Sequence, residues 1–353
     1  MVPGLLSLTA CAGPGSPEVR PADAPDFDET ALVDVLPPDA IRSIDQPRFE
    51  PSASADWLEP RSPVLAFAHR GEARAYPLGI LTRHEIVNDE IGGTPVAVTY
   101  CPLCNSGLVY ERTLNGRVLT FGVSGKLYHS DLVMFDRETS SLWPQIQGVA
   151  VEGDLKGSTL VPLASAIVSF DDFRSRYPEG RVLARPASRS YDDNPYAGYD
   201  SRSGPTGGFF RGEVDERLDA MERVVGIAIG DEARAYPYGA LQDASVVHDE
   251  VGGTQIVVFW GGEAASALDR PLISEGRRVG GSGVFEPLLD GRRLTFQERD
   301  GAIVDSQTGS TWSLLGQATA GKLAGATLTP LHHLDAFWFA WAAFVPFTEI
   351  WSA

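Results

Sequence analysis

Two cysteines are the clearest candidates for chemistry in this sequence. Cys101 and Cys104 lie in "VTYCPLCNSGLVYER" (98–112), after a run of β-branched and aromatic residues that predicts a buried strand. The whole chain holds 3 cysteines, so a closely spaced pair is unlikely to be incidental. His84 in "HEIVND" and His129 in "KLYHS" are the histidines that we consider as further members of a site.

Several chemistries need a CxxC pair. A structural zinc site needs four ligands, which His84 and His129 complete if the fold brings them to the two thiolates. Copper is a second option, because thiolates and imidazoles select it. A thiol–disulfide centre needs only the two cysteines, but such motifs usually open a helix, whereas this one runs from strand through turn to strand. A cysteine nucleophile activated by a histidine is the fourth option.

The third cysteine belongs to the N-terminal segment. Cys11 follows a short apolar run, "LSLTA", and precedes a tether rich in Pro, Ala and Asp. This pattern is typical of a lipoprotein signal, in which cleavage occurs before a cysteine that then carries lipid. Residues 1–10 lack the basic residues that usually begin such a signal. We expect an extracytoplasmic, membrane-anchored protein of the cell envelope, with Cys11 as its lipidation site.

Composition limits the possible partners. The chain has 353 residues and a net charge of -18. Nucleic acids bind basic surfaces, so we expect no nucleic-acid partner. The apolar stretch at 336–347 is too short to span a membrane. We therefore expect contact with the membrane through the N-terminal lipid alone.

Internal similarity organises the chain. Four segments return in the same order and with similar spacing, which predicts two copies of one unit. Each copy contains short β-branched runs broken by Gly and Asp, with one or two helical segments. We expect an α+β fold of two tandem units, mostly antiparallel sheet, with one or two helices each. The matching segments are 71–81 with 231–241, 88–100 with 248–260, 116–121 with 291–296, and 138–163 with 307–331.

Four regions follow from this similarity. We expect a signal region and tether at 1–60, a first unit carrying the CxxC pair at 61–184, a joining segment at 185–223, and a cysteine-free second unit at 224–353. The joining segment is rich in Tyr, Gly and Asp, so we expect it to pack against a domain face or to line a cleft.

The second copy lacks the candidate site. "VFWGGEAASALD" (258–269) replaces the cysteine segment, and residues that would correspond to the "KLYHS" region are missing. His84 aligns with Ala244. Since the second copy does without all of these residues, we interpret Cys101, Cys104, His84 and His129 as functional rather than architectural.

The sequence resembles a known family. "ARAYPLGILTRHEIVNDEIGGTPVAVTYCPLCNSGLVYER", "FGVSGKLYHSDLVMFDRETSSLWPQ" and "NPYAGYD" are similar to family 3179 of the domains of unknown function, over about residues 60 to 350. The family pattern includes the CPLC pair and the HEIVND histidine. The resemblance implies an exported protein or lipoprotein and brings no established activity.

We predict a thiol-based metal site, for copper or zinc, with Cys101, Cys104, His84 and His129 as candidate ligands. The strand–turn setting and the nearby imidazoles favour metal over dithiol redox chemistry, which remains the alternative. A further alternative is a non-enzymatic binding module with a structural disulfide, in which the joining segment and "SLWPQ" (141–145) form a pocket.

Overall fold

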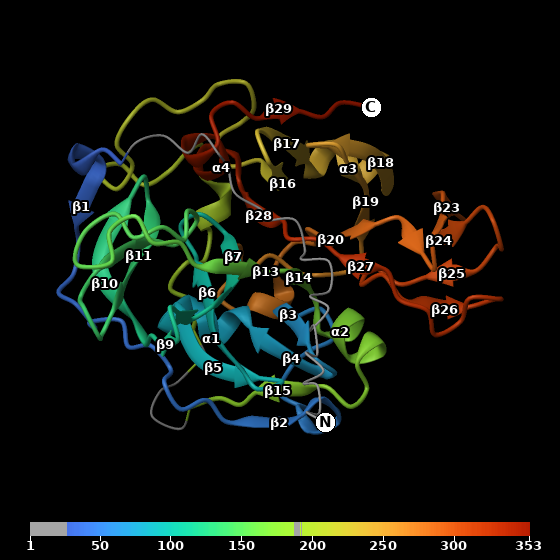
Figure 1. The fold of residues 1–353 in the computed structure, drawn as a ribbon, viewed down its shortest axis with the longest axis horizontal. Helices are drawn as coiled ribbons and strands as arrows, with labels where there is room; N and C mark the ends of the chain where they lie inside the picture. The colour runs from blue at the N-terminus through green and yellow to red at the C-terminus, as the bar shows by residue number, and fades with distance from the viewer. Residues whose placement is uncertain (1–26, 187–190, 192) are drawn as a thin grey trace, which may run out of the picture.

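The computed structural model describes residues 27–186, 191 and 193–353. Cys11 lies outside these residues. Strands account for 43% of the residues and helices for 12%, so the fold is β-rich (Figure 1). Nearly all strand pairs are antiparallel, as predicted, and the helices are few and short.

The N-terminal half contains three sheets. The first has the order β13-β7-β6-β5, the second β14-β3-β4-β15-β2 and the third β1-β10-β11-β12. Among the strands described in this half, β4 and β15 alone pair in parallel. A small hairpin, β8–β9, lies beside them. The strands are β1 (Leu32–Asp34), β2 (Phe49–Pro51), β3 (Pro63–His69), β4 (Glu72–Pro77), β5 (Ile86–Ile91), β6 (Thr94–Cys101), β7 (Ser106–Glu111), β8 (Thr113–Leu114), β9 (Arg117–Val118), β10 (Phe121–Tyr128), β11 (Asp131–Asp136), β12 (Leu142–Pro144), β13 (Val161–Leu163), β14 (Ala166–Ser169) and β15 (Arg181–Leu183).

The C-terminal half also contains three sheets of four strands and one small hairpin, β21–β22. Their orders are β28-β16-β17-β29, β18-β19-β20-β27 and β23-β24-β25-β26. The sheet of β23–β26 lies at one end of the molecule's longest dimension (Figure 1). The strands are β16 (Arg223–Ile229), β17 (Glu232–Pro237), β18 (Val246–Val251), β19 (Thr254–Gly261), β20 (Gly281–Glu286), β21 (Leu288–Leu289), β22 (Arg292–Arg293), β23 (Phe296–Arg299), β24 (Ala302–Asp305), β25 (Thr311–Trp312), β26 (Ala318–Ala320), β27 (Thr329–Pro330), β28 (Leu334–Phe337) and β29 (Glu349–Ile350).

The helices follow strands directly. Pro77 and Pro237 end β4 and β17, and each stands immediately before a helix, where its fixed φ suits the first turn. Ser169 caps another helix, because its hydroxyl accepts from the backbone N–H of Asp172. The helices are α1 (Leu78–His84), α2 (Phe170–Arg176), α3 (Tyr238–Asp243) and α4 (Trp338–Phe344), with 3-10 turns η1 (Glu29–Ala31), η2 (Ser52–Ser54), η3 (Tyr199–Ser201) and η4 (Ile273–Glu275).

The apolar residues of "LGILTRHEIVND" (78–89) are spaced as in a helix, but the helix formed there is shorter than that spacing. It ends at His84, and Glu85 has φ 57, which turns the chain out of the helix. Ile86 and Val87 then begin β5, are fully buried, and pair with β6. Their β-branched side chains suit a strand, so sheet pairing prevails over helical spacing here.

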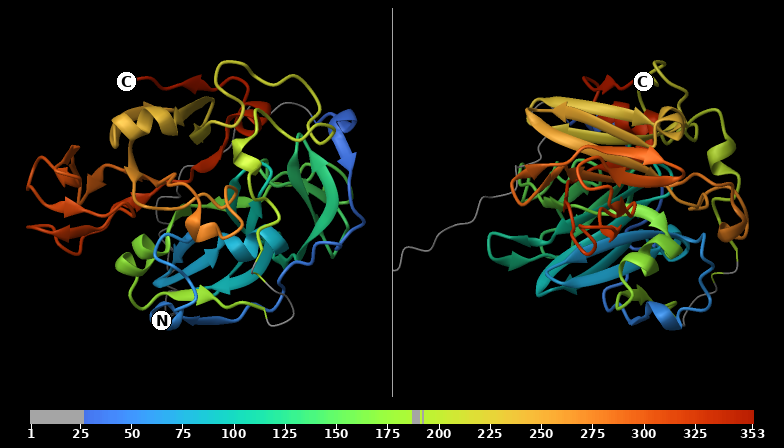
Figure 2. Two further views of the ribbon diagram at one scale, coloured as in Figure 1. Left: turned by 180° about the vertical axis from the view of Figure 1, so that it is seen from behind. Right: turned by 90° about the vertical axis from the view of Figure 1, so that its right-hand side faces the viewer.

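The two halves share their hydrophobic core. β28 lies against β7, and β14 lies against β20, so strands of the two halves contact each other (Figure 1). The side view in Figure 2 shows strands of the C-terminal half, in gold, stacked over those of the N-terminal half, in blue and teal. One core cluster joins Tyr100, Cys101 and Cys104 to Phe337 and Trp338. The cysteine pair therefore lies inside the molecule, where the halves meet.

Within the described residues, no helix has the length and apolarity that crossing a membrane requires. The aromatic stretch at 336–347 forms the end of β28, helix α4 and the residues after it, and most of its side chains are buried in the shared core.

Candidate metal centre

The hairpin β6–β7 holds both cysteines. Cys101 ends β6 and pairs with Ser106, the first residue of β7, so the turn between them carries Cys104. Asn105 has φ 53, which closes this turn, and its side chain accepts a hydrogen bond of 3.1 Å from the Tyr100 hydroxyl. The backbone N–H of Phe337 donates to the Cys104 carbonyl at 2.9 Å. The strand–turn–strand setting predicted from the sequence is therefore confirmed.

A carboxylate completes a cluster with the two thiols. Single ligand atoms of Cys101, Cys104 and Asp131 all lie within 4.8 Å of one another, and the three residues are buried. Asp131 begins β11, after Ser130, which has φ 68. The Cys101 thiol donates to the Ser130 carbonyl at 3.6 Å, which holds the β10–β11 turn against the hairpin.

Asp131 has one oxygen available. Its Oδ2 accepts the backbone N–H of Ile146 at 2.9 Å. Its Oδ1 is shielded from solvent and has no hydrogen-bond partner among the described residues. A buried oxygen without a partner is costly, and a cation would satisfy it.

Burial shifts the pKa values of the acidic groups in and beside the cluster. Burial raises the pKa of Asp131 well above its usual range, and the nearby Glu85 carboxyl raises it further. Burial also raises the pKa of the Cys104 thiol, as does its hydrogen bond with Cys101. Burial alone raises the pKa of Glu85 to about 8. Burial therefore favours the protonated, uncharged form of these acids, and a cation bound among them would favour the ionised form.

The predicted histidines lie outside the cluster. His84, the last residue of α1, forms hydrogen bonds of 2.7 Å through Nδ1 to the Arg42 carbonyl and through Nε2 to the Tyr191 hydroxyl. His129 donates from Nδ1 to the Arg211 carbonyl at 2.6 Å, and its ring packs against Phe344. The structure thus joins Cys101 to Cys104 and directs both imidazoles to other partners.

Sequence reasoning missed two acidic residues that stand beside the predicted histidines. Glu85 follows His84, and Asp131 lies two residues after His129. The signal was present in the sequence, because the second half has Ser245 in place of Glu85 and a shortened segment before β24. The histidines at the same places are the more familiar metal ligands.

The joining segment covers the cluster. Burial raises the pKa of Tyr199, and the neighbouring Cys104 and Cys101 raise it further. Burial likewise raises the pKa of Tyr196, with Glu85 and Cys101 as nearby acids. Asp200 is buried and pairs with Arg223 at 2.9 Å, which fixes this segment to β16. The expected packing of the Tyr-rich join against a face of the protein is therefore observed.

One comparison with known proteins gives a match. The family model described as "Protein of unknown function (DUF3179)" matches residues 38–348, which is nearly the whole chain. No curated protein and no solved structure matches the chain.

Proposed function

The chain belongs to the DUF3179 family of proteins of unknown function, and from its own site we propose that it binds a thiophilic metal ion, zinc or copper, at Cys101, Cys104 and Asp131. One observation carries this proposal: two thiols and a carboxylate converge within 4.8 Å in a buried place. Zinc–sulfur bonds are about 2.3 Å and zinc–oxygen bonds about 2.0–2.2 Å, so ligand atoms of one tetrahedral site lie roughly 3.5 Å apart. Small side-chain movements would bring the three atoms to that spacing.

Charge balance supports the same ion class. Deprotonation of both thiols and of Asp131 leaves three negative charges, which a buried site tolerates only beside a cation. Zinc accepts both thiolate and carboxylate ligands. Copper(I) would use mainly the two thiolates, because it prefers soft ligands. In this proposal His84 and His129 position the surrounding segments rather than bind the ion, since each holds a backbone carbonyl.

Metal analysis tests the proposal. Protein purified under reducing conditions should retain about one equivalent of zinc or copper through dialysis, and Cys101→Ser, Cys104→Ser or Asp131→Asn should each abolish retention. Asp300→Asn is the matched control, because Asp300 is the exposed residue that aligns with Asp131 in the second half. Full metal retention by the Cys101→Ser and Cys104→Ser variants would refute the site.

Dithiol redox chemistry is the second candidate. The two sulfurs are close, and both cysteines are free. The burial of both sulfurs opposes this role, because a catalytic thiol must be accessible to its partner. Protein that holds no metal, has two titratable thiols and has a reduction potential in the range of catalytic pairs would favour it. An unreactive disulfide whose replacement only lowers stability would favour a non-enzymatic binding module.

We also propose that the chain is a tandem pair of related units. The supporting observation is that strand orders correspond: β13-β7-β6-β5 with β27-β20-β19-β18, and β14-β3-β4-β15 with β28-β16-β17-β29. Matching hydrogen bonds add support, since Trp143 donates to Asp136 and Trp312 donates to Asp305, both at 3.0 Å.

Location is a separate proposal. We infer that Cys11 carries a lipid that anchors the protein outside the cytoplasmic membrane, on the basis of the "LSLTAC" pattern. Labelling of cells with a radioactive fatty acid should mark the wild-type protein and not Cys11→Ser. Equal labelling of both would exclude lipidation at this residue.

A further inference from the structure

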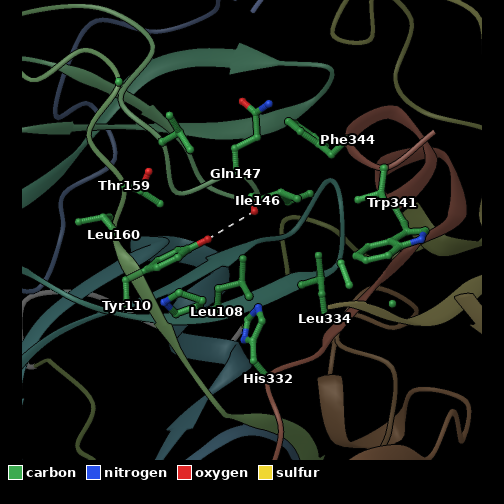
Figure 3. A pocket seen from close by; sticks show the side chains of 16 residues that line it. Leu108, Tyr110, Ile146, Gln147, Thr159, Leu160, His332, Leu334, Trp341 and Phe344 are labelled. Carbon is green, nitrogen blue, oxygen red and sulfur yellow. Dashed lines mark hydrogen bonds between the residues drawn. The ribbon is translucent and has the colours of Figure 1, made fainter. Parts of the chain in front are cut away.

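A cavity of about 300 Å³ lies where strands from both halves meet (Figure 3). Cys101, Cys104 and Asp131 do not line it. β7 contributes Leu108 and Tyr110, β28 contributes Leu334, and α4 contributes Trp341 and Phe344. The volume is twice that of a 150 Å³ cavity that takes up benzene. It also reaches the lower end of the range for small-molecule sites.

The contact of β14 with β20 is the counterpart of the contact of β28 with β7, and it encloses much less space. Residues that align with this lining surround a cavity of only about 60 Å³, between β3, β14 and β20. Ala68 aligns with Ala228, and Pro330 aligns with Pro162. The same arrangement of strands leaves only a small space between β3, β14 and β20. The arrangement therefore does not by itself require the larger cavity.

The two cavities differ at two aligned positions, where His332 and Gln147 of the larger one correspond to Ala164 and Leu315 of the smaller one. The smaller cavity has polar groups of its own, from Ser165 and His333, but much less space beside them. His332 Nδ1 and Gln147 Oε1 are shielded from solvent, and neither has a hydrogen-bond partner among the described residues. Tyr110, which aligns with Phe285, already donates its hydroxyl proton to the Gln145 carbonyl at 2.7 Å.

The available atoms are acceptors. The other ring nitrogen of His332 donates to the Leu163 carbonyl, and burial lowers the pKa of His332 to about 4. The ring is therefore neutral at pH 7, with a lone pair at Nδ1. None of the described residues that line the cavity is Asp, Glu, Lys or Arg. An anion would face acceptors, and a cation would lose its hydration without a counter-charge.

We propose that this cavity binds an uncharged aromatic molecule of about two rings that carries a hydroxyl or N–H donor for His332 and Gln147. The rings of Tyr110, Trp341 and Phe344 provide the aromatic surroundings. This site is additional to the metal centre and does not depend on it. The backbone N–H of Ile146 contacts Asp131, and the Ile146 side chain lines the cavity, so the two sites are neighbours.

The test uses 2-naphthol and naphthalene, which differ by one hydroxyl. Equilibrium dialysis of the full chain at pH 7 should give one saturable site, with 2-naphthol binding about 2- to 12-fold tighter than naphthalene, the range of one net hydrogen bond. His332→Leu should reduce this preference, and His332→Leu combined with Gln147→Leu should bring it to about onefold, while naphthalene still binds. His69→Leu is the matched control, because His69 is hydrogen-bonded to Thr94 away from the cavity and should leave the preference unchanged.

A second pair of variants tests the location. Ala228→Phe fills the larger cavity and should abolish binding, whereas Ala68→Phe, at the aligned position, should not. Equal binding of the two ligands by the wild-type protein, or no saturable binding of either, would overturn the proposal. A crystal structure at saturating 2-naphthol that shows only water on His332 Nδ1 would overturn it as well. The wild-type comparison needs no variant to fold.

Discussion

The hairpins β6–β7 and β19–β20 have equivalent registers and different connections. Cys101 pairs with Ser106 at the end of the first, and Gly261 pairs with Gly281 at the end of the second. A short turn joins β6 to β7, whereas residues 262–280 form a long excursion between β19 and β20. The same backbone pairing therefore forms with and without cysteines. The sheet does not require Cys101 or Cys104.

The hairpins β10–β11 and β23–β24 also differ, in the burial of an aspartate at their turns. β10–β11 presents Asp131 in a buried position, whereas the shorter β23–β24 hairpin turns at Asp300, which is exposed. At the cavities it is the C-terminal half that has the polar residue. It contributes His332 to the larger cavity, and the N-terminal half has Ala164 at the aligned position of the smaller one. The cysteine pair and the larger cavity therefore both lie beside β7. This comparison leads to three predictions.

The largest expected effect tests the equivalence of the halves. Asp136 accepts from Trp143 Nε1 at 3.0 Å, and Asp305 accepts from Trp312 Nε1 at 3.0 Å. Each carboxylate also accepts from a nearby Thr, Thr139 or Thr308. Asp136→Ala and Asp305→Ala should each lower the free energy of unfolding by roughly 2–4 kcal/mol, because several buried donors lose their acceptor. Urea denaturation followed by circular dichroism measures this.

Asp154→Ala is the control, because Asp154 is exposed. It should change the free energy of unfolding by less than about 0.5 kcal/mol. A large cost for Asp136→Ala with none for Asp305→Ala would show that the sheet of β23–β26 unfolds on its own, and the comparison of the halves would then fail energetically.

Local patterns in the sequence predicted the strands around Cys101 well. The run before it is β-branched, and Asn105 and Gly107 follow, so strand, turn and strand are encoded within a short window. The position of Asp131 is not encoded in this way. It depends on the packing of the β10–β11 turn onto a hairpin some thirty residues earlier in the chain, and no periodicity reports that contact.

Local pattern does not give the end of α1, for a related reason. The apolar spacing of "LGILTRHEIVND" fits a helix, but β6 offers Ile86 and Val87 a sheet edge, and Glu85 changes direction with a positive φ. Tertiary pairing therefore decided the element. The large cavity also lay beyond sequence reasoning, because His332 and Gln147 come from opposite halves of the chain.

The second prediction concerns pH and the two cavities. The folded-state pKa of His332 is about 4, whereas an unfolded histidine titrates near 6.5. The fold favours the neutral ring, so its stabilisation is complete above about pH 6.5 and is lost as the pH falls through 4. Between pH 7 and pH 4 the wild-type protein should lose roughly 2–3 kcal/mol more stability than His332→Ala, which has the residue of the other cavity.

Denaturation profiles at several pH values measure this difference. Titration of the His332 ring by nuclear magnetic resonance gives the pKa independently of stability. A measured pKa at or above 6 would contradict the prediction, because the ring would then be in contact with water or with an acidic group.

The smallest expected effect concerns two equivalent ion pairs, one in each half. Asp89 accepts from Arg74 and from Tyr76, and Asp249 accepts from Arg234 and from Tyr236. The first pair is more buried, with side-chain exposures of 13% and 6% against 23% and 16%. Screening by water weakens exposed pairs, so Asp89→Asn should cost about 1–2 kcal/mol and Asp249→Asn about 1 kcal/mol.

Salt provides the control for this prediction, since only exposed charges are strongly screened. The cost of Asp249→Asn should shrink between 0.05 and 0.5 M NaCl, and that of Asp89→Asn should change less. Arg234 also pairs with Glu349, whose side chain is exposed, which adds to the salt-sensitive part. A larger cost for Asp249→Asn at both salt concentrations would mean that burial does not set the difference, and that the C-terminal half depends more on this pair than its exposure indicates.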